Sequence, residues 1–197
     1  MDRNLFFVHV RETVFGGHMT PGQASGLGAI LDYKDKNFAK MADPDFAYAL
    51  ATTTWETART MQPIAEIGHG RGRAYGHPTG PWHQIYYGRG DVQETWERNY
   101  KFATQRLRAL GLLKADEDLE KTPDLAMRPD IAAAILFVGM TEGWFTGKKL
   151  DSYIHGTVCD FTNCRRIING TDHAPAIAAI ARSYQHALET AADKKAA

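Results

Sequence analysis

Glu56 and Glu66 are the two side chains whose type and spacing suit a reaction, because they lie ten positions apart where the chain changes character. Hydrolysis of a glycosidic bond needs two carboxyl groups facing each other across a cleft. One gives a proton to the leaving oxygen, and the other activates water or attacks the sugar. The apolar neighbours Trp55 and Met61 are expected to shield Glu56 from water, which is the environment that a general acid requires.

The elements that must position these glutamates are a helix before them and a small β lobe after them. Asp43 followed by Pro44 is typical of a helix start, and apolar residues at helical spacing predict a helix as far as about Thr60, with Glu56 in its last turns. The glycine-rich segment 68–90 predicts short strands and turns, as a small antiparallel hairpin or an irregular sheet. Such a junction would supply one carboxyl from each side.

Helical patterns predict most of the remaining chain. A capping box of Thr20 and Gln23, with proline between them, predicts a helix to about Lys34. Further helices are expected over 92–113 and over 131–142, the latter buried because it is apolar nearly all round. One or two short helices should fall within 153–168. A last helix should begin at Thr171 or Asp172, and the tail 191–197 should fray.

Composition indicates one globular domain over residues 1–197. Of the 197 residues, 44% are hydrophobic and 23% are charged, and the formal net charge is zero. This balance excludes a disordered chain, and it gives no whole-molecule attraction to nucleic acid. No apolar run approaches the ~20 residues of a membrane span, so membrane insertion is not expected. The N-terminus lacks a signal sequence, so synthesis in a cytoplasm is expected.

Four segments in order resemble the family 19 glycoside hydrolases, which include chitinases and phage-type endolysins. Residues 47–64 resemble the helix that carries the family's acid. Residues 86–100 read Tyr-Tyr-Gly-Arg-Gly followed by Gln, Thr and an Asn-Tyr pair, the most recognisable segment of the family. Residues 143–150 and 165–172 resemble later segments of the bacterial and phage branch. The resemblance covers roughly residues 46–188.

The resemblance implies a mainly α, lysozyme-like α+β domain with a small β lobe, and an inverting mechanism. It implies that Glu56 is the general acid, that Glu66 is the base acting on a water molecule, and that Thr95 helps to hold that water. The expected substrate-binding residues, which line the cleft or contact the N-acetylated sugar, are Tyr86, Gln93, Asn99 and Asn169. Because the loop before Glu66 varies in length within the family, Asp91 remains the alternative base.

Two positions depart from the family pattern. Trp55 stands where the family usually has histidine, so the imidazole hydrogen bonds are lost although the indole can still pack over Glu56. Glu94 stands where the family usually has an apolar residue between Gln93 and Thr95. An inward Glu94 would add a third cleft carboxylate and couple the titrations of the others, whereas an outward one would be solvated. We favour the outward orientation.

No cofactor or metal is predicted. His69, His77 and His83 lie in one loop without the close spacing of a zinc motif, and they are interpreted as loop residues bonded to backbone or sugar. The same loop carries Arg71 and Arg73, and two hypotheses remain open for them: they bind a polymer, with arginines suited to the carboxylates of peptidoglycan stems, or they form a solvated surface.

The functional hypothesis is therefore an endolysin-type glycosidase that cleaves β-1,4 bonds of peptidoglycan for cell-wall lysis. It would be made in the cytoplasm, that of the host if phage-encoded, and would act on the wall after release. Peptidoglycan is favoured over chitin because the chain lacks the cysteine-rich module and disulfides of secreted plant-type chitinases. The alternatives are a small bacterial chitinase and a non-catalytic saccharide-binding relative. A monomer is expected.

Overall fold

The computed structural model describes residues 1–193, and its centre is the apolar segment that the sequence predicts to be buried. Helix α5 (Pro129–Glu142) is buried from Ile131 to Met140 and ends at Gly143, whose left-handed backbone (φ 81°) stops the helix. Its apolar surface on all sides leaves no face for solvent, so several other elements pack against it. The prediction of a buried central helix is confirmed.

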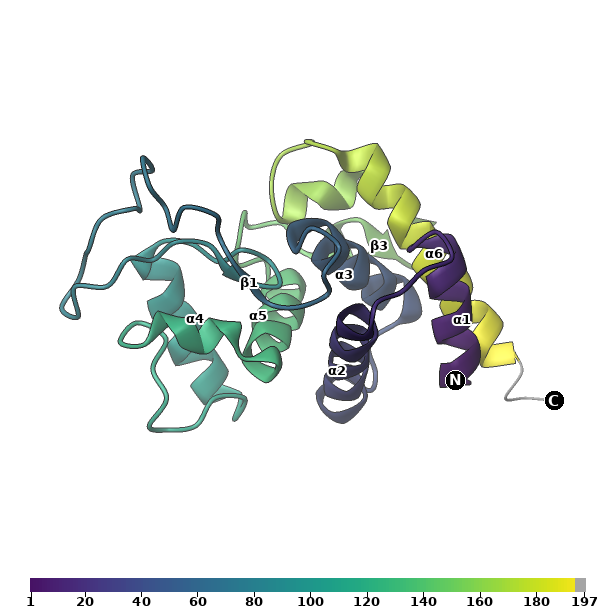
Figure 1. The fold of residues 1–197 in the computed structure, drawn as a ribbon, viewed down its shortest axis with the longest axis horizontal. Coiled ribbons are helices and arrows are strands. Elements are labelled where there is room, and N and C mark those ends of the chain that lie inside the picture. Colours follow the sequence, from purple (N-terminus) through teal and green to yellow (C-terminus); the bar gives the residue numbers. More distant parts are fainter. Residues whose placement is uncertain (194–197) are drawn as a thin grey trace.

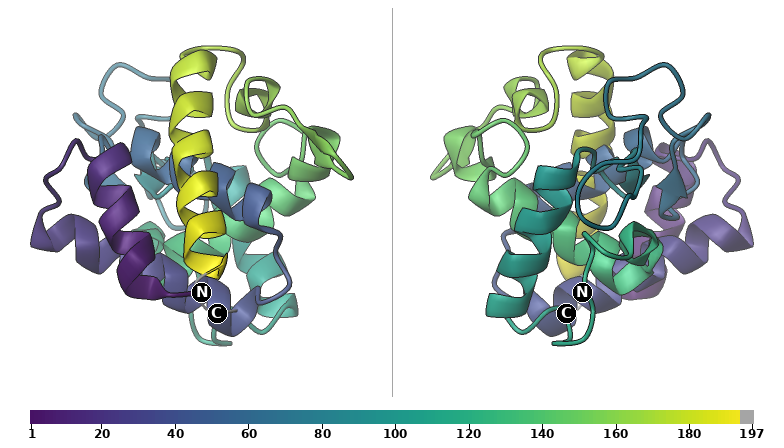
Figure 2. Two further views of the ribbon diagram at one scale, coloured as in Figure 1. Left: turned by 90° about the vertical axis from the view of Figure 1, so that its right-hand side faces the viewer. Right: turned by 90° about the vertical axis from the view of Figure 1, so that its left-hand side faces the viewer.

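Five more α-helices of the described chain are placed around α5 (Figure 1). Helix α3 packs most extensively against the long helix α6, which also contacts α1, while α2 and α4 contact α5. The two views of Figure 2 show α6 running beside α1, with the N-terminus and the last turn of α6 at the same end of the molecule. The bounds are α1 Arg3–Thr13, α2 Pro21–Asn37, α3 Asp43–Glu56, α4 Glu97–Ala109 and α6 Ala174–Asp193.

The β content is small. Strand β1 (Ile64–Ala65) pairs antiparallel with β2 (Arg89–Gly90), and the chain between them is mostly turns. A second hairpin joins β3 (Ile154–His155) to β4 (Val158–Cys159). It lies between the short 3₁₀ helices η2 (Leu150–Ser152) and η3 (Asn163–Ile167), and a third such helix, η1 (Pro123–Met127), precedes α5. The mainly α class with a small β lobe is thus confirmed, as are the short helices, whereas α1 and the second hairpin were not predicted.

The start of a helix agrees with the sequence prediction where nearby side chains cap it. Thr20 and Gln23 form the reciprocal capping box of α2, which runs three residues further than predicted, to Asn37. At α3 the prediction is wrong in detail, because Ala42 rather than Asp43 occupies the cap position and makes no side-chain bond. The last helix begins at Ala174, and residues 194–197 of the tail that was expected to fray lie outside the described part.

Two helix predictions were too long, and both errors fall at the site. Helix α3 ends at Glu56 instead of Thr60, because Ala58 and Arg59 take positive φ values and Arg59 N–H bonds back to the carbonyl of Thr54. Helix α4 begins at Glu97 instead of Val92 and ends at Ala109. Residues 92–96 instead form a tight loop that includes positive φ values at positions 93 and 96.

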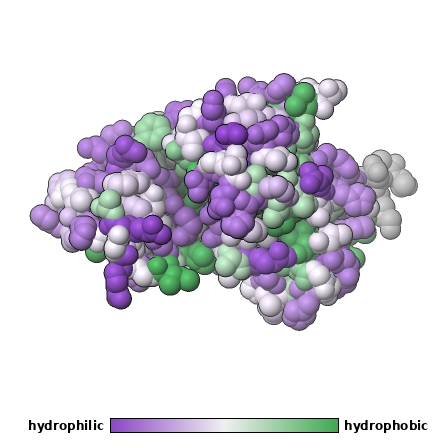
Figure 3. Space-filling view, turned by 90° about the horizontal axis from the view of Figure 1, so that it is seen from above, coloured by the Kyte–Doolittle hydropathy of each residue, from purple (hydrophilic) through white to green (hydrophobic). Residues whose placement is uncertain are grey.

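Seen from above, the surface of the molecule is mostly hydrophilic with scattered hydrophobic side chains (Figure 3). Among the described residues, no helix combines the length and the apolar character that a membrane crossing needs.

Candidate active site

A cleft of about 560 Å³ lies where the end of α3, the β1–β2 lobe, the loop before α4 and η3 meet. Glu56 and Glu66 both line it, so the two carboxyl groups selected from the sequence share one cavity. Other residues that line the cleft include Arg73, Tyr75, Gly88, Gln93, Glu94, Thr95, Arg98, Asn99, Arg165 and Asn169. Every predicted site residue except Tyr86 is in this set.

Glu56 is the last residue of α3, and its side chain forms an ion pair with Arg165 of η3. Both side chains are largely buried, with 16% of Glu56 and 5% of Arg165 exposed. Arg165 also donates from Nε to the carbonyl oxygen of Asp172, at 3.1 Å. The guanidinium is therefore fixed from two sides and holds the Glu56 carboxyl in the cleft.

The residues expected to shield Glu56 are engaged elsewhere. The Trp55 ring packs against His173, with ring centroids 4.8 Å apart. Met61 is fully buried, and its sulfur accepts from the hydroxyls of Thr54 and Tyr184. Among the described residues, Arg165 supplies the one hydrogen bond and ion pair recorded for the Glu56 side chain.

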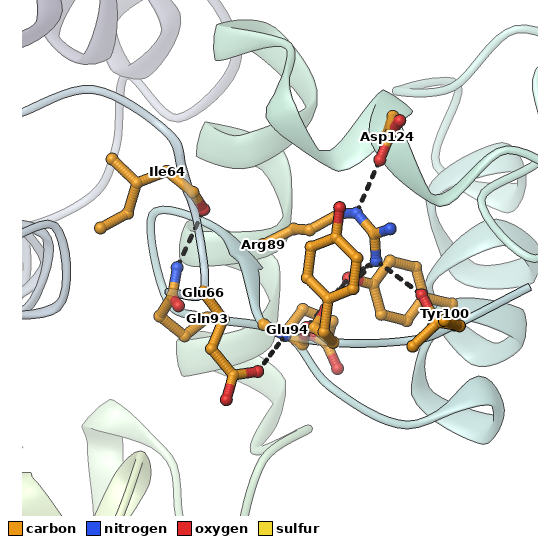
Figure 4. Close-up of polar contacts among 10 residues, drawn as sticks. Ile64, Glu66, Arg89, Gln93, Glu94, Tyr100 and Asp124 are labelled. Carbon is orange, nitrogen blue, oxygen red and sulfur yellow. Dashed lines mark hydrogen bonds and ion pairs between the residues drawn. The ribbon is translucent and has the colours of Figure 1, made fainter. Parts of the chain in front are cut away.

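Glu66 follows β1, and two hydrogen bonds hold its carboxylate. Tyr75 donates its hydroxyl to Oε1 at 3.0 Å. The Gly88 N–H donates to Oε2 at 3.1 Å, along the dashed line drawn from the Glu66 carboxylate in Figure 4. Burial raises the pKa of Tyr75, and so does its bond to Glu66, so this hydroxyl remains a donor at neutral pH. The backbone pair from Glu66 N–H to the Gly88 carbonyl, at 2.7 Å, fixes the same position.

The Tyr-Tyr-Gly-Arg-Gly segment owes its shape to the buried Arg89. Its guanidinium donates to Asp124, to the carbonyls of Ile85 and Tyr87 and to the Tyr100 hydroxyl, and it lies 3.5 Å from the centre of the Tyr87 ring (Figure 4). These bonds tie the lobe to η1 and α4. The motif therefore works as a scaffold that presents the Gly88 N–H to Glu66.

Both glycines of this segment lie in close contact with neighbours, and at Gly90 the neighbour is backbone, which cannot move aside as a side-chain end can. A Cβ at Gly88 would lie 2.8 Å from Oε1 of Gln93, and one at Gly90 would lie 2.9 Å from the carbonyl oxygen of Ala126. Gly90 also has φ +83°, a left-handed conformation that side chains disfavour. The lobe can reach α5 and η1 only with glycine at this position.

Thr95, Asn99 and Asn169 lie in the cleft as the resemblance implies. Asn99 donates to the Thr95 carbonyl at 2.8 Å, which fixes the loop that carries Thr95. Gln93 also lines the cleft, and its amide nitrogen donates to the carbonyls of Ile64 and Gly90, at 3.0 and 3.3 Å. Gln93 thus joins the loop to β1.

Tyr86 and Asp91 lie outside the cleft-lining set. Tyr86 is buried, and its hydroxyl donates to the carbonyl of Glu120 at 2.8 Å, so the structure gives it a place in the core of the lobe. Asp91 is 1% exposed, and burial raises its pKa to about 7. Its Oδ1 has no hydrogen-bond partner among residues 1–193.

The expectation of an outward, solvated Glu94 is wrong. Glu94 is 4% exposed and lines the cleft, and burial raises the pKa of its carboxyl to about 8, with the Asn99 side chain acting in the opposite direction. The expectation assumed that residue 94 belonged to a helix. It belongs instead to the loop whose backbone pairs Glu94 with Arg89, which turns the side chain inward.

Sequence reasoning missed the cationic part of the cleft. Arg73, Arg98 and Arg165 all line it, and the first two are exposed. Arg73 was singled out only as one of several basic residues in its loop. Arg165 lies 109 positions from Glu56, so no local pattern links the two residues.

The glycine-rich loop holds its histidines apart from any cluster of ligands. The His69 ring stacks on Tyr87 with centroids 4.5 Å apart. Within the part of the chain that the structure describes, no three His, Cys, Asp or Glu side chains are grouped as metal ligands.

Comparisons with known proteins bear on the fold. No protein-family model matches the chain, and no curated protein sequence matches it. The crystal structure of chitinase C from Streptomyces griseus HUT6037 superposes with a TM-score of 0.59 at 21% identity, over 96% of this chain and 75% of that one. A Glu-to-Gln variant of chitinase C gives 0.55 at 21% identity, over 98% and 92%.

A bacterial family 19 chitinase superposes with a TM-score of 0.49 at 24% identity, over 83% of this chain and 85% of that one. The two chitinase C structures share the fold of this protein over nearly the whole chain. The chain therefore has the fold of the family 19 glycoside hydrolases, as the resemblance in its sequence predicts.

Proposed function

We propose that the protein is a glycoside hydrolase that cleaves β-1,4 bonds of an N-acetylated polysaccharide by an inverting mechanism. The observation that carries this proposal is that Glu56 and Glu66, which come from separate elements, line one cleft. Neither fold nor motif alone assigns an activity, but two carboxyl groups in one groove are what the chemistry needs.

Glu56 is proposed as the general acid that protonates the leaving oxygen. Once it has given up its proton, Arg165 stabilises the resulting carboxylate through a charge-assisted bond. Glu66 is proposed as the base, since it lines the cleft whereas Asp91 does not. Its two fixed hydrogen bonds orient the carboxylate toward a water molecule, which the Thr95 hydroxyl helps to hold.

Peptidoglycan is the proposed substrate, and cell-wall lysis of the endolysin type is the proposed role. The exposed guanidinium groups of Arg73 and Arg98 in the cleft suit a glycan that bears carboxylates, as peptidoglycan does on its peptide stems. Chitin carries no such charge. It remains the second candidate because both structures that support the fold are those of a chitinase.

Product analysis tests the proposal. Purified peptidoglycan and N-acetylglucosamine oligomers are incubated with equal amounts of the protein, and mass spectrometry identifies the products. Faster release of fragments from peptidoglycan, together with turbidity loss of permeabilised cells, is expected, and the identity of the new reducing end names the bond. Release from the oligomers alone would assign a chitinase. Absence of new reducing ends from both would reduce the proposal to saccharide binding.

A further inference from the structure

Glu94 is a buried acidic group that the proposed roles leave unused. It lies between Gln93 and Thr95 in the loop before α4, and all three residues line the cleft. Its backbone is fixed by two bonds with Arg89, at 3.0 and 3.2 Å, and by the Tyr100 hydroxyl, which donates to its carbonyl at 3.0 Å. The backbone of residue 94 therefore has a defined position in the cleft wall.

No cationic side chain is paired with the Glu94 carboxyl in the described chain, and the Asn99 side chain, whose hydrogen bond favours the charged form, acts against the larger effect of burial on its pKa. The side chain is 4% exposed, and among residues 1–193 its Oε2 has no hydrogen-bond partner. An ionised carboxylate in such a place would be costly, whereas a neutral acid needs only one acceptor for its O–H. A buried carboxyl on a residue that lines an open cleft, with one oxygen that lacks a protein partner, points to a partner on the ligand.

The surrounding charges do not change this conclusion. The titratable and charged groups that share the cleft are Glu56, Glu66, Arg73, Tyr75, Arg98 and Arg165. Arg165 is paired with Glu56, and Tyr75 donates to Glu66. Behind the loop, the Arg89 guanidinium is directed to Asp124 and Tyr100. No ion pair with Glu94 is present in the described chain.

We infer that Glu94 acts as a neutral carboxylic acid in the cleft wall and donates a hydrogen bond to an acceptor of the bound glycan, such as an acetamido carbonyl oxygen. This inference rests on the proposed function and deepens it, because it names a residue that selects N-acetylated sugars. Ionisation of Glu94 removes the donor and adds a third negative charge beside Glu56 and Glu66. Glycan binding should therefore weaken as pH rises through the pKa of about 8.

The test measures binding without turnover. Isothermal titration calorimetry gives the Kd of the N-acetylglucosamine tetramer for the Glu56→Gln protein between pH 6 and pH 10. The Kd should be level below pH 7 and should rise by up to tenfold per pH unit above 8. Adding Glu94→Gln, which keeps a neutral donor, should leave a level Kd across the range. Adding Glu94→Leu should raise the Kd about tenfold at pH 6, the loss of roughly one hydrogen bond.

Glu120→Gln is the matched control, because Glu120 also has a buried oxygen without a partner in the described chain but lies outside the cleft. This variant should follow its parent at every pH. A Glu94→Leu protein that binds as its parent does would overturn the inference. If that protein does not fold, a rise in Kd above pH 8 that persists in Glu94→Gln would overturn it equally. If the parent does not bind the tetramer, the same titrations use a soluble peptidoglycan fragment, and failure of the parent to bind either glycan would remove the proposed function, and the inference with it.

Discussion

The ion pair between Glu56 and Arg165 lies at the end of α3, and in the proposed mechanism Arg165 serves the site twice. It holds the Glu56 carboxyl in the cleft, and its positive charge would stabilise the carboxylate that remains after proton transfer. Trp55, which precedes Glu56, packs against His173, so the hydrogen bond that holds the Glu56 carboxyl comes from a guanidinium of a distant segment.

Glu56→Gln should remove proton donation while keeping shape and the bond to Arg165. We expect kcat to fall by about 10²–10⁴-fold, the usual contribution of general acid catalysis, with little change in KM. Release of reducing ends from peptidoglycan measures this. Glu12→Gln is the control, since Glu12 is exposed on α1, and it should keep full activity. Undiminished lysis by Glu56→Gln would show that the acid is another residue.

Glu66→Ala should remove the base and leave a space for a small anion. We expect activity to be lost, and azide to restore it with formation of a glycosyl azide of inverted configuration, which NMR of the product identifies. A surviving rate without azide would transfer the role to another group. Asp91 is the alternative on sequence, and Asp91→Asn in the same assay decides between them. The buried position of Asp91 predicts that this variant still turns over.

At the scale of elements, the site depends on a lobe with very little regular structure. Strands of two residues each cannot hold a loop of this length, so the shape depends on the Arg89 network and on glycines at contact points. The gap between β2 and α4 also matters, because residues 92–96 present Gln93, Glu94 and Thr95 to the cleft only as a loop. A helix starting at position 92 would have spread them around its axis.

Gly90→Ala tests this dependence on close contact. The new Cβ would lie 2.9 Å from the Ala126 carbonyl, at a backbone with φ +83°, so both strain and a clash with η1 are expected. Gly16→Ala is the matched control, since φ is +65° there and nothing lies within 4 Å. The control should lose about 1 kcal/mol of unfolding free energy from backbone strain, and Gly90→Ala should lose about 2–3 kcal/mol more. Urea unfolding measures both, and equal losses would refute the contact argument.

At the scale of the whole molecule, the neutral net charge conceals an uneven distribution of charge. Two carboxyl groups, Asp91 and Glu94, are buried without ion-pair partners in the described chain, while arginines line the cleft. Burial of these two carboxyl groups therefore lowers the free energy of unfolding by an amount that depends on pH. Below about pH 4 both native and unfolded chains carry these protons, so the cost is absent.

Between about pH 4 and 8 the unfolded chain releases the two protons while the native state keeps them, so the free energy of unfolding should fall as pH rises. Burial raises the pKa values to about 7 and about 8, and each unit of difference between the two states is worth ~1.4 kcal/mol. Asp91→Asn should flatten the part of this fall below pH 7. Asp116→Asn, at an exposed position, should not. Urea unfolding at each pH measures the curves, and parallel curves for Asp91→Asn and the parent would contradict the assignment.

What the sequence by itself determined is the set of local features. The capping box of Thr20 and Gln23, the apolar segment that becomes α5, and the presence of a helix carrying Glu56 before a glycine-rich lobe all depend on neighbouring residues. The order of the four motifs then predicted the fold, and it also predicted one cleft for both glutamates, which the structure shows. Propensity and capping operate within a few positions, so a single sequence reveals them.

Only the tertiary structure decided which side chains meet and which way they face. Arg165 reaches Glu56 across 109 positions, and the Arg89 network turns Glu94 inward while it places Tyr86 in the core and buries Asp91. Loop residues have no fixed periodicity from which an inward or outward side can be read. Their orientation depends on long-range bonds to elements that fold elsewhere in the chain, and no pattern of neighbouring residues contains that information.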